Sequence, residues 1–68
     1  MKKEQIIKVL EGALAKVKDL QDILVQVQLW AMDREQYWYA NRAELAGDYL
    51  YYAQKEIEEL LGLKYEEL

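Results

Sequence analysis

The apolar residues in the first half of the chain recur at alternating intervals of four and three. This spacing places them along one side of an α-helix, at the a and d positions of a packed seam. We therefore predict a helix over residues 3–32. Val25, Leu29 and Met32 add a second apolar patch near its end. The seam residues are Ile6, Leu10, Ala13, Val17, Leu20, Leu24, Val27 and Ala31.

A second apolar stripe follows residue 33 and is out of phase with the first. A straight helix would aim the two stripes at different partners, because they differ by a rotation of roughly 140°. A turn near residue 33 lets them face each other, so we predict a second helix over residues 34–61. A long kinked helix exchanged between subunits is the alternative. The second stripe consists of Tyr39, Ala43, Ala46, Leu50, Ala53, Ile57 and Leu60.

Charge favours the antiparallel arrangement. Residues 1–18 carry five lysines and two glutamates, whereas residues 54–68 carry two lysines and five glutamates. Folding the chain back on itself brings these oppositely charged segments together, which stabilises the hairpin modestly and in a salt-dependent way.

The residues around the expected turn carry the signals of a helix start. Asp33 can cap the second helix, and Gln36, three residues later, can complete a capping box. Met32 and Tyr37 have the spacing of a hydrophobic staple. Together these features place the turn at Asp33.

The three glycines differ in their expected roles. Gly62 can take the left-handed conformation that ends a helix, with Leu63 folding back onto Ile57. Gly12 and Gly47 lie within the stripes, and we interpret them as mid-helix residues that allow a neighbouring helix to approach closely. A break at Gly47 that splits the second helix is the alternative. The whole chain, residues 1–68, is expected to form one domain with a short tail over residues 62–68.

Composition points to a chain chosen for helix formation. Hydrophobic residues make up 53% of the sequence, with three glycines and no proline. Serine, threonine, histidine, cysteine and phenylalanine are also absent, although serine is common in natural proteins and caps many helices. These absences indicate an engineered sequence. A small natural helical protein, for example one encoded by a phage, is the alternative.

The same absences exclude most chemistry. Without Ser, Thr, Cys or His the chain has no common nucleophile or imidazole base. Four carboxylates could lie close enough together to bind a magnesium ion: Asp19, Asp22, Glu44 and Asp48. They lie off the apolar stripes, however, and are expected to face water. We therefore expect no enzyme, no cofactor and no metal site.

The net charge of −4 argues against nucleic-acid binding. Apolar stretches are too short to cross a membrane, so we expect a soluble protein, cytoplasmic or recombinant.

One hairpin leaves apolar surface uncovered, which predicts self-association. We expect an all-α antiparallel two-helix hairpin that forms a homo-oligomeric helical bundle, with four helices if it is a dimer. The predicted function is a non-enzymatic self-assembling module, designed and without natural biochemical activity. The alternative is a small acidic inhibitor or adaptor that binds a partner protein through its Tyr/Trp-rich face. The predicted interface comprises Val25, Leu29, Trp30, Met32, Trp38, Leu45, Tyr49 and Tyr52.

Overall fold

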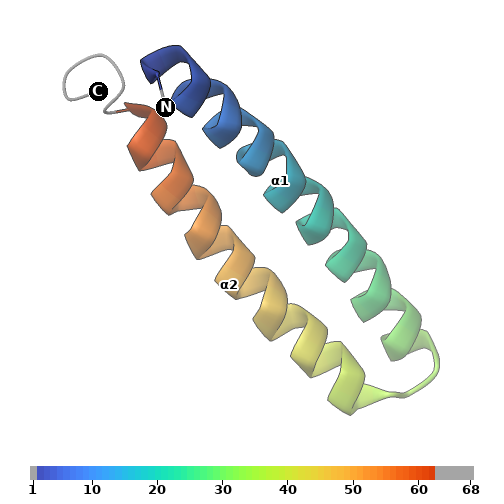
Figure 1. The fold of residues 1–68 in the computed structure, drawn as a ribbon. Coiled ribbons are helices and arrows are strands. Elements are labelled where there is room, and N and C mark those ends of the chain that lie inside the picture. The colour runs from blue at the N-terminus through green and yellow to red at the C-terminus, as the bar shows by residue number, and fades with distance from the viewer. Residues whose placement is uncertain (1, 63–68) are drawn as a thin grey trace.

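The computed structural model describes residues 2–62 as two long α-helices joined by a short turn (Figure 1). Helix α1 spans Lys3–Asp33 and helix α2 spans Tyr37–Gly62. The helices lie side by side and run antiparallel, so that α2 returns to the end of the molecule at which α1 begins (Figure 1). The predicted all-α hairpin is confirmed, and the described chain does not form the alternative single kinked helix.

Residue type explains the length of the helices. The chain has no proline, and Leu, Ala, Glu, Lys and Gln all favour helix. At the start of α1, the backbone N–H of Lys2 donates a hydrogen bond of 2.9 Å to Oε1 of Gln5, which satisfies a donor that the helix itself leaves free. Both helices continue through their internal glycines, so α2 is not split at Gly47.

The turn is built from backbone hydrogen bonds and not from the predicted aspartate cap. The N–H of Gln36 donates to the carbonyl oxygen of Ala31 at 2.8 Å, and the N–H of Glu35 donates to that of Met32 at 3.1 Å. This pair of bonds is the Schellman arrangement that closes the C-terminus of a helix. Glu35 adopts the left-handed conformation that the arrangement requires, with φ of 57°.

The predicted position of the turn was therefore wrong by a few residues. Asp33 is the last residue of α1 and does not cap α2. Gln36 precedes α2, and its carbonyl oxygen accepts the N–H of Ala40 at 3.0 Å. The Met32–Tyr37 staple fails for the same reason, because it depended on a cap at Asp33. Helix α1 ends one residue later than predicted, and α2 begins three residues later than the side-chain signal indicated.

The helices meet along a seam that is rotated from the predicted one. Leu20 and Val27, placed at the seam by their spacing, remain 48% and 40% exposed. Gln21 and Gln28 are half-buried instead. On α1 the seam consists of Ile7, Leu10, Leu14, Val17, Gln21, Leu24, Gln28 and Ala31; on α2 it consists of Ala40, Ala43, Gly47, Leu50, Gln54, Ile57 and Leu61.

The core of the single hairpin is very small. Among the described residues only Ala31, Ala40 and Ala43 are buried, and all three lie near the turn. A Cβ atom built on Gly12 or Gly47 would meet nothing within 4 Å, so the predicted close approach of a helix at these glycines does not occur within the chain.

The glycine at the end of α2 also differs from its expected role. No glycine in residues 2–62 has a positive φ, so Gly62 ends α2 without the predicted left-handed conformation. The predicted contact between Leu63 and Ile57, and the tail that follows, involve residues outside the described part of the chain.

Candidate association surface

The residues beside the seam define two broad faces of the hairpin. Successive residues of a helix are 100° apart, so the residue before a seam position and the residue after it lie on opposite sides of the seam. Val25, Glu44 and Asp48 each directly follow a seam residue, and all three line the same groove. Because the helices are antiparallel, the residues that follow seam positions in both helices share this face. The residues that precede them share the other face.

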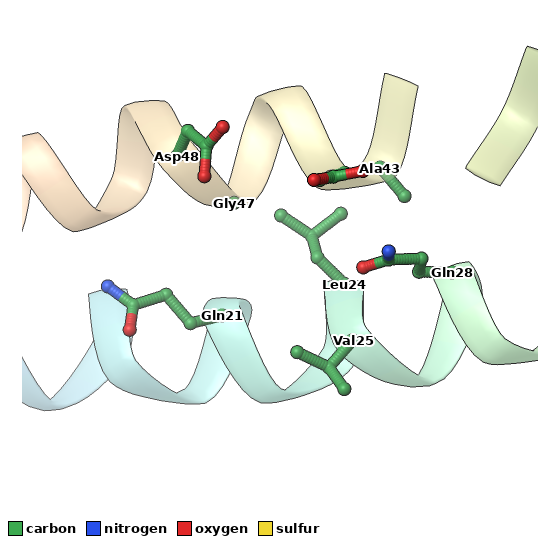
Figure 2. A pocket seen from close by; sticks show the side chains of 8 residues that line it. Gln21, Leu24, Val25, Gln28, Ala43, Gly47 and Asp48 are labelled. Carbon is green, nitrogen blue, oxygen red and sulfur yellow. The ribbon is translucent and has the colours of Figure 1, made fainter. Parts of the chain in front are cut away.

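The face that carries the groove is mostly polar, and we call it the polar face. The groove has a volume of about 200 Å³ and lies between Leu24 and Gln28 of α1 and Ala43 and Gly47 of α2. Leu24 points toward α2, whereas Val25 points away from it (Figure 2). The charged residues of this face are Lys8, Glu11, Lys18, Asp22, Glu44, Asp48, Lys55 and Glu58.

The opposite face is dominated by large apolar side chains, and we call it the apolar face. Its charged residues within the helices are Lys16, Arg42 and Glu56. The alanines of this face, among them Ala46 and Ala53, lie partly within the seam and are half-buried. The large hydrophobic residues of this face that remain exposed are Val9, Leu20, Ile23, Val27, Trp30, Tyr39, Tyr49 and Leu60.

A third apolar region lies on the outer side of α2. Trp38, Leu45 and Tyr52 fall opposite the seam at spacings of seven residues, and they are 63%, 41% and 65% exposed. The corresponding outer positions of α1 are Gln5, Gly12, Asp19, Gln26 and Asp33, which are polar or lack a side chain. The outer apolar strip therefore belongs to α2 alone.

The eight residues of the predicted interface are all exposed, but they do not share one face. Trp30 and Tyr49 lie on the apolar face. The other six residues divide between the remaining surfaces. Val25, Leu29 and Met32 lie on the polar face near the turn, and Trp38, Leu45 and Tyr52 lie on the outer side of α2.

Sequence reasoning placed some of the apolar face in the wrong location. Leu20 and Val27 were assigned to the seam between the two helices. A stripe of three to four apolar residues per two turns is wide enough to contact both the other helix of the same chain and a second molecule. Apolar spacing alone therefore could not separate these residues from the seam.

Comparisons with three sets of known proteins identify no relative of this chain. No protein-family model matches the chain, and neither curated proteins nor solved structures gave a significant match.

Several exposed aromatic rings interact with cations of their own helix. The guanidinium of Arg34 lies 4.6 Å from the ring centre of Trp30, and that of Arg42 lies 5.4 Å from Trp38. The Trp38 and Tyr39 rings meet edge to face at 5.0 Å. Such contacts contribute only about 0.5–1 kcal/mol at exposed sites. They orient the rings without covering them.

The surface has few features of a chemical site. Lys55 and Glu58 form the ion pair observed in residues 2–62, at 3.7 Å and within one helix. In the same part of the chain, no three acidic side chains come close enough to hold a metal ion. Neither described helix has an apolar stretch of the length needed to cross a membrane. The main feature of the candidate association surface is its large area of exposed apolar side chains.

Proposed function

We propose that the chain is a non-enzymatic self-assembling helical module whose minimal unit is a homodimeric four-helix bundle. The observation that carries this proposal is the absence of any buried side chain larger than alanine in the described hairpin. A stable fold needs far more apolar burial than three alanines supply, because ordering each residue costs about 1–2 kcal/mol of conformational entropy. A second layer of helices supplies that burial.

The distribution of the apolar residues supports a closed dimer. Eight exposed large hydrophobic residues lie on the apolar face, whereas the polar face carries eight charged residues and has exposed apolar side chains such as Val25, Leu29 and Met32 mainly toward the turn. A symmetric pair of hairpins covers the apolar face of both copies and leaves the polar faces outward. An open-ended chain of copies would bury the eight charged side chains of the polar face in a second interface.

The size of the apolar face also suits a dimer. Two helices side by side are about 20 Å wide, and 26 residues of helix extend about 39 Å, so the face covers roughly 800 Å². This area matches the surface that each partner contributes to a standard protein interface.

We further infer that the sequence was designed for assembly. The missing serine, threonine and proline, together with the abundance of strong helix formers, suit a chain whose requirement is to form helices.

Sedimentation equilibrium over a range of concentrations tests the proposal. The 8.1 kDa chain is expected to sediment as a species of about twice that mass, with dissociation only on strong dilution. A folded 8.1 kDa monomer at micromolar concentration would contradict the proposal.

A second candidate function is protein binding by the outer side of α2. Trp38, Leu45 and Tyr52 remain exposed when two apolar faces are joined, and Trp and Tyr are enriched at binding hot spots. If this region binds a partner, Trp38→Gln with Tyr52→Gln would abolish that binding and leave the oligomer mass unchanged. A change in mass would instead place these residues in the assembly interface.

A further inference from the structure

We propose that the two hairpins of the dimer dock through their apolar faces with both turns at the same end, so that α1 of each copy lies on α2 of the other. This inference rests on the proposed self-association and specifies the arrangement of the second copy. Two-fold symmetry permits one other face-to-face arrangement, with the turns at opposite ends. That arrangement places α1 on the partner's α1 and α2 on the partner's α2.

The register of the hairpin determines which side chains meet in each case. Gln21 hydrogen-bonds Gln54 across the seam, and Gln28 lies near Ala43 at the groove. Between these contacts, Leu20 lies level with Ala53 and Val27 lies level with Ala46. In the same register Lys16 lies level with Glu56, on the side of the glutamine pair away from the turn.

Side-chain size favours turns at the same end. On the apolar face α1 presents bulky residues, including Leu20, Val27 and Trp30, and α2 presents Ala46 and Ala53 between larger residues. Docking α1 on the partner's α2 places Leu20 over the partner's Ala53 and Val27 over the partner's Ala46. Large side chains then fill the space left by small ones, as close packing requires. Turns at opposite ends would instead place Leu20 and Val27 of the two copies on α1 helices that face each other, and Ala46 and Ala53 on α2 helices that face each other.

Charge favours the same arrangement. With the turns at one end, Lys16 lies level with the partner's Glu56, and the four charges alternate around the bundle. With the turns at opposite ends, the two Lys16 side chains approach each other to within about two helical turns, as do the two Glu56 side chains. Like charges flanking an apolar interface destabilise it, whereas opposite charges set orientation. Lys16 and Glu56 thus act as orientation signals on the apolar face.

The ends of the helices extend this pattern. Lys2 precedes α1, and Lys3 and Lys8 lie in its first two turns with one acidic residue, Glu4; the last two turns of α2 carry Glu56, Glu58 and Glu59. Same-end docking surrounds each basic segment with two acidic segments, one from its own chain and one from the partner. The contribution is long-range and decreases with salt, because these charges face water.

Distance measurement between spin labels tests the arrangement. The chain has no cysteine, so Gln36→Cys gives one label per copy at the turn. Turns at the same end predict a label separation below about 25 Å. Turns at opposite ends predict more than about 35 Å, because α2 alone is about 39 Å long.

Lys18→Cys is the matched control. Lys18 lies near the middle of the hairpin on the polar face. The distance between the two Lys18 labels of a dimer is therefore similar and intermediate in both arrangements, and its detection reports dimer formation. A dimer with a long Gln36 separation would overturn this inference and leave self-association intact. A Lys18 separation below about 15 Å would place the polar face in the interface and also overturn it. Absence of coupling at both sites together with a monomeric mass would contradict the proposed function itself.

Discussion

Gln21 and Gln54 form a hydrogen bond across the seam between the helices, with Nε2 of Gln21 donating to Oε1 of Gln54 at 3.0 Å. Nε2 of Gln54 also donates to Oε2 of Glu58 at 3.5 Å. Both glutamines occupy positions that an apolar side chain would normally hold in a helical seam. A polar pair at such a position fixes the alignment of two helices, because sliding one helix separates the two amides.

Gln54→Leu alone is expected to destabilise the protein by about 0.5–1 kcal/mol, since the half-buried amide of Gln21 loses its partner. Gln21→Leu with Gln54→Leu is expected to recover at least that loss, because both seam positions become apolar. Urea denaturation at fixed protein concentration measures both changes. Additive effects of the two single substitutions would show that the amides do not interact.

Glu35→Gly is expected to stabilise the protein by about 0.5–1 kcal/mol. Glu35 has φ of 57°, a left-handed conformation that is strained for residues with a Cβ atom and unstrained for glycine. Glu35→Ala is the control for loss of the carboxylate, and it should give little or none of the gain. Equal effects of the two substitutions on the thermal midpoint would assign the change to charge and not to backbone strain.

Gly47→Ala and Gly12→Ala are each expected to stabilise the protein by up to about 1 kcal/mol, because alanine favours helix over glycine. The added methyl group meets nothing within 4 Å at either site. Gly47 lies at the groove and Gly12 on the outer side of α1, so neither substitution should change the mass of the oligomer. Dissociation of the oligomer by either alanine would show that an association surface had been placed wrongly.

Ile23→Glu and Val25→Glu form a matched pair that tests the two broad faces. Ile23 and Val25 are both 52% exposed and lie two residues apart, but Ile23 belongs to the apolar face and Val25 to the polar face. Ile23→Glu is expected to weaken dimerisation at least tenfold, because a carboxylate in an apolar interface loses its hydration. Val25→Glu is expected to leave the dissociation constant within about twofold of the original value, since a rim or surface charge has little effect on binding energy. Sedimentation equilibrium compares the two, and the reverse order of effects would assign assembly to the polar face.

Much of the fold could be predicted from apolar spacing. The change of phase between Ala31 and Tyr39 favoured folding back over a long kinked helix, and the structure contains two antiparallel helices. The location of the turn was harder to predict, because Asp33 offered a side-chain cap while the actual turn uses backbone hydrogen bonds. The conformation of Glu35 had no sequence signal, since glycine is the usual residue at that position.

The association surface could be predicted only in outline. Exposed apolar area followed from the length and composition of the chain, but its placement depended on how far each helix rotates about its axis. Gln21 and Gln28 are polar and were therefore not expected at the seam, and their presence there moved Leu20 and Val27 outward. A rotation of only about 50°, half the angle between successive residues, transferred these side chains from an internal contact to an external face.

The buried alanines beside the turn have a consequence for how the hairpin opens. Ala31, Ala40 and Ala43 hold the helices together next to a three-residue connection, where the entropic cost of closing the chain is lowest. Pairing therefore begins at the turn and proceeds toward Lys3 and Gly62, and separation runs in the opposite direction. Two assembled copies could therefore exchange subunits by separating first at the Lys3 and Gly62 ends of their helices, while the helices of each chain stay paired beside the turn.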